Sequence, residues 1–76
     1  MNEQRRKAIA KAAELLETAA ELLDMTADAE EDELNRMPLN LQISRQGIAM
    51  RNNADIIAYV VEQIRQAAEV ITEAIK

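Results

Sequence analysis

The only proline and the only glycine of this chain both lie near its centre, and this placement limits the folds that it can adopt. Pro38 lacks an N–H and would clash with the preceding turn, so a regular helix does not run through it. Met37, the residue before it, is pushed toward extended geometry. Residues 39–43 alternate apolar and polar side chains, which predicts a short extended connector. Ser44 is then a good N-cap for a second helix.

Long stretches without proline lie on both sides of this centre. Residues 3–35 consist mainly of Ala, Leu, Glu and Lys, which are strong helix formers. Residues 45–75 also show the periodicity of a helix, with apolar residues seven positions apart. Each helix would be roughly 45 Å long. Equal lengths favour antiparallel packing. We therefore expect one all-α domain over residues 1–76, an antiparallel helical hairpin with helices at about 3–35 and 45–75 and a Pro-containing loop at about 36–44.

Apolar residues recur every seven positions in both predicted helices, and the resulting stripes are wider than a two-position coiled-coil seam. One neighbouring helix does not cover such a stripe. A 76-residue chain without cysteine also lacks disulfide staples, and association is a common remedy. We therefore expect a homo-oligomeric helix bundle. Its predicted core comprises Ile9, Leu16, Leu23, Asn53, Ile57, Ile64 and Ile71.

Two features of these stripes carry further expectations. Asn53 falls on a core position, where a buried Asn usually fixes register or oligomeric state; a ligand contact is the alternative. Rows of small residues are expected on the flanks of the stripes, where they permit close approach of helices. These flanking residues are Ala13, Ala20 and Ala27 in the first helix, and Ala54, Val61 and Ala68 in the second.

The charges are segregated along the chain. Nine acids and no base lie between Glu14 and Glu33, whereas three arginines and no acid lie between Leu34 and Ala54. The net charge of −5 argues against non-specific nucleic-acid binding. The acidic run lacks the glycine of a calcium-binding loop, and the chain lacks the histidine of a di-iron bundle. We interpret the acids as solvated helix surface and expect no metal.

Other function classes are excluded by what the chain lacks. Without His, Cys or a recognisable nucleophile–base pair, we expect no enzymatic activity and no cofactor; chemistry by carboxylates alone is the alternative. No apolar run approaches about 18 residues, so we expect no membrane span. The basic N-terminus lacks the apolar region of a signal peptide, which favours a cytoplasmic protein.

The acid-free segment is the candidate binding site. The start of a helix offers free N–H groups and partial positive charge to an anion, and arginine forks suit phosphate. Gly47 would let an anion approach the backbone closely. As alternatives, the arginines neutralise the acidic end of the first helix, and the apolar connector side chains cover the open end of the hairpin. The candidate ligand-binding residues are Arg36, Gln42, Ser44, Arg45, Arg51 and Asn52, completed by Arg5 and Arg6 of another subunit.

Three features together resemble a group of short, all-helical phage proteins. These are a basic opening (Arg5-Arg6-Lys7), a long acidic helix before a Met-Pro-x-x-Leu-Gln-x-Ser centre (residues 37–44), and a closing helix with Asp55-Ile56-Ile57. The chain departs from that group at Arg45-Gln46-Gly47, where Glu-Arg-type residues usually follow the serine. This departure puts the preference for ligand or partner in doubt.

Small helical phage proteins include antagonists of bacterial defence, some of which are oligomeric sponges for cyclic or ADP-ribose-type nucleotides. The resemblance therefore implies a non-enzymatic binding protein that sequesters an anionic signalling nucleotide in the host cytoplasm. It carries over no site residues. The alternative function is a helical protein-interaction module, an inhibitor or adaptor that docks on a host protein.

Overall fold

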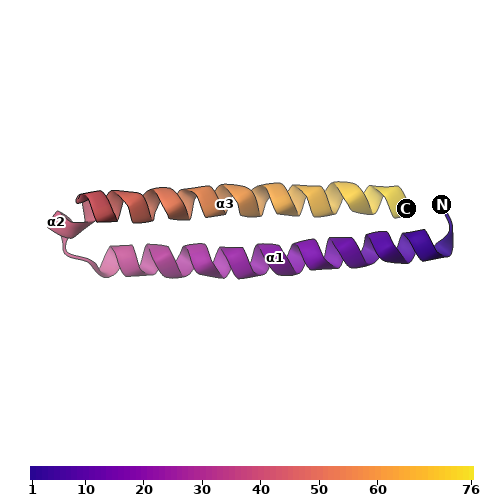
Figure 1. The fold of residues 1–76 in the computed structure, drawn as a ribbon, viewed down its shortest axis with the longest axis horizontal. Coiled ribbons are helices and arrows are strands. Elements are labelled where there is room, and N and C mark those ends of the chain that lie inside the picture. Colours follow the sequence, from indigo (N-terminus) through magenta and orange to yellow (C-terminus); the bar gives the residue numbers. More distant parts are fainter.

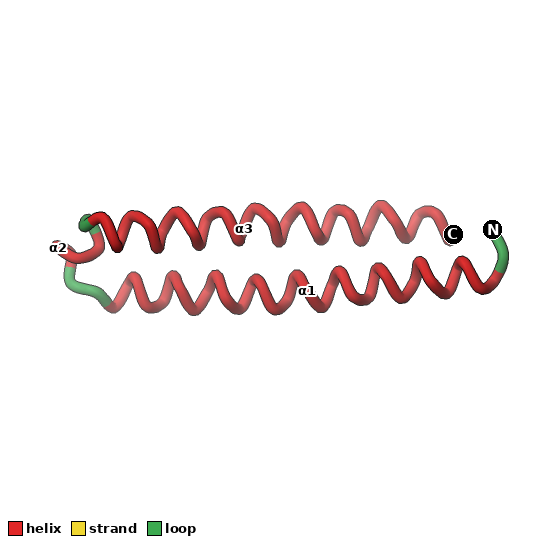
Figure 2. Tube along the Cα trace, viewed as in Figure 1, coloured by secondary structure: helices red, strands yellow, loops and turns green.

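The computed structural model describes residues 1–76 and consists of helices alone. The elements are α1 (Glu3–Arg36), α2 (Leu39–Gln42), α3 (Arg45–Thr72) and the short 3₁₀ helix η1 (Glu73–Ile75). Figure 1 shows α1 and α3 side by side and antiparallel, with α2 at one end and both chain termini at the other. Figure 2 shows how little of the chain lies outside helices. The all-α prediction is confirmed.

The chain is a rod rather than a compact body. Its Cα atoms span 58 × 14 × 13 Å, and its radius of gyration is 17.2 Å. A compact chain of this length has a radius of gyration of roughly 11 Å. Only 8 of the 76 residues are buried, so the helix pair by itself has a thin core.

Side chains and proline define where the two long helices begin and end. The Asn2 side chain caps α1 by accepting a hydrogen bond from the Arg5 N–H at 2.8 Å. Met37, at the end of α1, is extended with ψ of 146°, as predicted from the proline that follows it. The Ser44 hydroxyl caps α3 by accepting from the Gly47 N–H at 3.3 Å, which confirms the predicted N-cap.

The prediction of an extended connector is wrong, because Leu39–Gln42 forms one helical turn. Proline suits the start of a helix, where its missing N–H costs nothing. The carbonyl of Pro38 accepts from the N–H groups of Leu41 and Gln42 at 2.9 and 3.0 Å. The Gln42 amide also donates to the Met37 carbonyl at 2.8 Å. These local hydrogen bonds outweigh the alternating pattern of side chains.

The core is a row of mostly small residues along each long helix, seven positions apart, with Leu34 and Val61 as the larger members. The expectation that these rows flank the stripe is wrong, because they form its buried centre. Small side chains let the two backbones approach closely, which pushes the bulkier rows to the side. The buried residues are Ala13, Ala20, Ala27 and Leu34 in α1, and Gly47, Ala54, Val61 and Ala68 in α3.

The residues predicted for the oligomer core lie beside this buried centre. Six of them are half-buried in the single chain, namely Ile9, Leu16, Leu23, Ile57, Ile64 and Ile71. Asn53 is exposed, so it has no place in the core of the single helix pair. Its role in an assembly stays a prediction.

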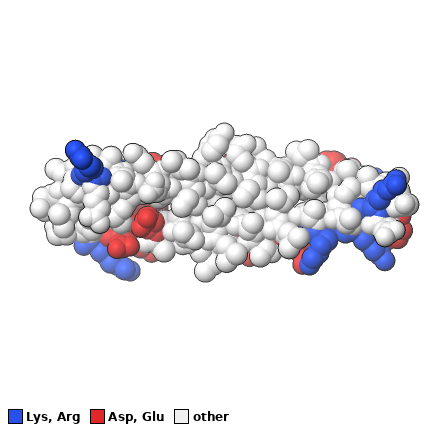
Figure 3. Space-filling model, viewed as in Figure 1, with Lys and Arg blue, Asp and Glu red and all other residues white.

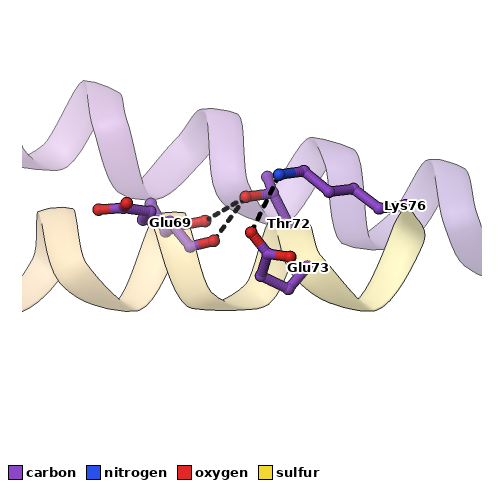
Figure 4. Close-up of polar contacts among 5 residues, drawn as sticks. Glu69, Thr72, Glu73 and Lys76 are labelled. Atoms are coloured by element: carbon purple, nitrogen blue, oxygen red, sulfur yellow. Dashed lines mark hydrogen bonds and ion pairs between the residues drawn. The ribbon is translucent and has the colours of Figure 1, made fainter.

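The far end of the pair is closed by local polar contacts (Figure 4). The Thr72 hydroxyl lies 2.6 Å from the Glu69 carbonyl and 3.2 Å from the Ala68 carbonyl, where α3 tightens into η1. Lys76 pairs with Glu73 at 3.0 Å. From α1, the Arg6 guanidinium donates to the Ile75 carbonyl at 2.9 Å, which ties the two ends together.

Candidate functional site

Two of the candidate arginines stand free at the connector end. Arg36 is the last residue of α1 and Arg45 the first residue of α3, and both side chains are exposed. Neither forms an ion pair. Asn52, about two turns further along α3, is also exposed. These three residues therefore keep their polar groups available for a partner.

Arg51 has different surroundings. It lines a small pocket of about 110 Å³ between α1 and α3, together with the carboxylates of Asp24, Asp28, Glu31 and Asp55. Four negative charges around one positive charge disfavour a phosphate. For Arg51, this arrangement supports the alternative that the arginine neutralises the acidic helix.

Gly47 does not serve the approach of an anion, and that expectation is wrong. Gly47 is buried, and a Cβ added to it would collide with the carbonyl oxygens of Leu41 and Gln42. These oxygens are hydrogen-bond acceptors and would repel an anion. Glycine is needed here because the α2 backbone packs directly on the first turn of α3.

The remaining candidate residues of the connector already have structural partners. The Gln42 amide is bound to the Met37 carbonyl, and the Ser44 hydroxyl caps α3 while donating to the Leu41 carbonyl. Two of the three apolar connector side chains do not cover the end of the pair, because Leu39 and Ile43 are 78% and 76% exposed, whereas Leu41 is 45% exposed.

Arg5 and Arg6 lie at the opposite end of the rod from the connector, beside the chain termini (Figure 1). Arg6 is half-buried and donates to the carbonyls of Met1 and Ile75. The Arg5 side chain is exposed and forms no ion pair. In a single chain, neither residue reaches the connector end.

One side of the helix pair is a charged groove, defined by the carboxylates around Arg51 and by a wider depression of about 460 Å³ lined by Glu14, Glu17, Arg65 and Glu69. Arg65 bridges the helices by pairing with Asp24 at 3.5 Å. The carboxylates of this groove do not gather into a set that could hold a metal ion.

The opposite side of the pair is an apolar face. Each residue turns about 100° around a helix, so positions one and four after a buried residue fall on one side. These positions carry the charges of the groove. Positions two, three and six after a buried residue fall on the other side. In both helices they are predominantly apolar.

The two apolar sides combine into one surface because the helices are antiparallel. A rotation of 180° about an axis normal to the plane of the two helices exchanges α1 and α3. The same positions of the two helices therefore face the same side of this plane. Figure 3 shows this face as uncharged over its middle, with charged side chains toward both ends. Leu22 and Val70 are 62% and 70% exposed there. The apolar face comprises Ala12, Leu15, Ala19, Leu22, Ile56, Val60, Ala67 and Val70, beside the half-buried Ile and Leu rows.

Sequence reasoning found the width of the stripes but missed that they share one side of the pair. In both helices the apolar residues lie two, three and six positions after the small-residue row. If these small-residue rows are taken as the buried centre, the sequence predicts that the two apolar stripes lie on the same side of the pair.

No helix combines the length and the apolarity that crossing a membrane requires. Comparisons with known protein families, curated proteins and solved structures gave no match.

Proposed function

We propose that this chain is a non-enzymatic helical association module, a helical hairpin that works by packing its apolar face against another protein surface. The observation that supports this function is the continuous apolar face opposite a charged groove. An exposed apolar surface of this extent, bounded by charges, is typical of an interaction site.

The surface area of the chain supports the same function. The single chain exposes 5774 Å², whereas a folded monomer of 8.5 kDa exposes roughly 4,700 Å². The excess of roughly 1,100 Å² exceeds the roughly 800 Å² that each partner buries in a standard interface. Burying the apolar face against a partner would lower the exposed area of the chain to about that of a folded monomer of the same mass.

Site-specific photo-cross-linking in cells that produce the chain tests this function. The photoreactive residue benzoylphenylalanine replaces either Leu22, on the apolar face, or its neighbour Glu21, on the solvated side of the same helix. Discrete cross-linked species, whether with a second copy or with another protein, are expected from position 22 only. Absence of cross-links at position 22, or equal cross-linking from both positions, overturns the association function.

A second candidate function is sequestration of an anionic signalling nucleotide. The observation that favours it is the pair of exposed, unpaired arginines at the connector end, Arg36 and Arg45, within a segment that has no acid. Charge-assisted hydrogen bonds from such forks to phosphate are stronger than neutral ones. Arg51 contributes less to this site, since carboxylates surround it.

Calorimetric titration with cyclic dinucleotides and ADP-ribose derivatives tests this second function. Arg45→Glu should weaken binding by about tenfold or more, because it replaces a donor with a negative charge. Lys11→Glu, at an exposed position away from both ends of the rod, changes the net charge equally and should leave binding unchanged. If the unmodified chain binds no compound of the panel at micromolar concentration, sequestration of these nucleotides is ruled out.

A further inference from the structure

One row of α1 along the apolar face ends in charges of opposite sign. This row contains Arg5, Ala12, Ala19, Thr26 and Glu33, spaced by seven. Arg5 and Glu33 are exposed, and neither has an ion-pair partner within the chain. Figure 3 shows acidic atoms over the connector half of α1 and basic atoms at both ends of the rod.

We propose that a second copy of this chain covers the apolar face, with its connector at the opposite end, so that Arg5 of each copy lies over Glu33 of the other. This inference rests on the proposed association function and names its partner. Arg5 and Glu33 are four heptads apart, about 42 Å along the helix, and Ala19 lies midway between them. A two-fold axis through Ala19 therefore brings both charge pairs together at once.

The same axis also matches the apolar side chains. When Ala19 faces Ala19 of the second copy, Leu15 lies over Leu23 and Leu16 over Leu22. Small residues at the midpoint allow the two α1 helices to approach closely, as the alanine row does within the chain. Leucines on both sides of the midpoint then close the interface.

The α3 helices match around an equivalent midpoint. The Asp24–Arg65 ion pair and the Arg6–Ile75 hydrogen bond place Ala19 level with the stretch of α3 between Glu62 and Val70, which includes Ala67. With Ala67 on the axis, Ile64 faces Val70 of the second copy and Val60 faces Ala74.

The reverse arrangement, with both connectors at one end, lacks this complementarity. There, α1 faces α3 of the second copy, so Arg5 and Glu33 no longer face each other. Electrostatic complementarity selects orientation more than it adds affinity, so the charges decide between two arrangements with similar apolar contact.

The dimer also changes what lies at the connector end. Arg5 of the second copy arrives beside Glu33, within reach of the segment that carries Arg36 and Arg45. The connector end of each chain is therefore incomplete without the other copy. Any anion site there contains arginines from two chains.

Cysteine cross-linking of the purified full chain tests the inference, and the chain has no cysteine of its own. Arg5→Cys and Glu33→Cys are each refolded alone or together and treated with a short bis-maleimide. We expect covalent dimers in the mixture and few in either variant alone. Ala19→Cys should cross-link with itself, whereas Glu21→Cys, on the solvated side, should not.

Three outcomes overturn the inference. If Ala19→Cys cross-links only when mixed with Ala67→Cys, the copies pack with their connectors at one end. If the Arg5→Cys and Glu33→Cys mixture gives no more dimer than each variant alone, the charge pairing is wrong. If light scattering gives a monomer of 8.5 kDa at micromolar concentration, no second copy covers the face. In that last case, cross-links to other proteins from position 22 in cells would leave the association function standing.

Discussion

At the scale of single residues, Gly47 and Ser44 hold the connector turn on the start of α3. The Cα of Gly47 packs against carbonyl oxygens of α2, and the Ser44 hydroxyl links the last turn of α2 to the first turn of α3. From the sequence, both residues are predicted to contribute to a ligand site. Their contacts assign them structural roles, and substitutions separate the two kinds of role.

Gly47→Ala should destabilise the chain, although alanine is the better helix former by about 1 kcal/mol. The added methyl group meets backbone atoms that cannot rotate away, and such overpacking typically costs about 1–3 kcal/mol. Urea unfolding should therefore show a lower midpoint for Gly47→Ala and little change for Gln46→Ala, its exposed neighbour. A gain in stability with Gly47→Ala would contradict the close approach of α2.

Ser44→Ala should lower the free energy of unfolding by about 1 kcal/mol, the usual value of an N-cap. Ser44→Asp should keep that stability, because aspartate caps a helix as well and suits its positive end. Thermal unfolding monitored by circular dichroism measures both variants. Equal losses in the two variants would point to the hydrogen bond that Ser44 donates to the Leu41 carbonyl, and no loss in Ser44→Ala would mean that the cap contributes nothing to stability.

At the scale of elements, the contact between α1 and α3 depends on rows of small side chains. Ala20 lies in the middle of its row and is fully buried, at 0% exposure. No other element covers this contact, so a change in spacing is transmitted along both helices. The ion pair between Asp24 and Arg65 adds little, because both side chains are more than two-fifths exposed.

Ala20→Leu should therefore destabilise the chain by about 1–3 kcal/mol, since the larger side chain pushes the helices apart. Ala10→Leu, at an exposed position of the same helix, should change the stability by less than about 0.5 kcal/mol. Chemical unfolding of both variants provides the comparison. Tolerance of leucine at position 20 would show that the helices do not approach as closely as the buried row indicates.

At the scale of the whole molecule, a rod with 8 buried residues has little to stabilise it unless its apolar face is covered. The helices, the caps and the buried row all form within one chain. The apolar face is the one large feature that a single chain leaves without a partner. In the proposed association, covering this face would therefore add to the stability of the molecule.

The melting temperature should accordingly rise with protein concentration, because folding linked to association follows mass action. Leu22→Gln should lower it, since burying a leucine side chain contributes about 1.5–3 kcal/mol and this contribution would be lost. Glu21→Gln, its neighbour on the solvated side, should leave it nearly unchanged. A melting temperature that is independent of concentration, with equal effects of both variants, would indicate a stable monomer.

The sequence by itself determined the two long helices and the residues at which they begin and end. Helix formers fill both long stretches, Pro38 stops α1, and Ser44 begins α3; each effect acts over a few neighbouring residues, so composition and spacing reveal it. The helical turn at Leu39–Gln42 was not predicted, because the alternation of apolar and polar residues over residues 39–43 indicated an extended segment. Local backbone hydrogen bonds stabilise the helical turn instead.

Only the tertiary structure decided which row is buried and what the candidate site residues contact. A wide stripe permits several rotations of one helix against another, and the close fit of small residues selected one of them. That rotation placed Arg51 among carboxylates, turned Gly47 toward α2, and left the Leu15 and Leu22 row outside. Contacts between residues far apart in the chain depend on this packing angle, which periodicity alone does not specify.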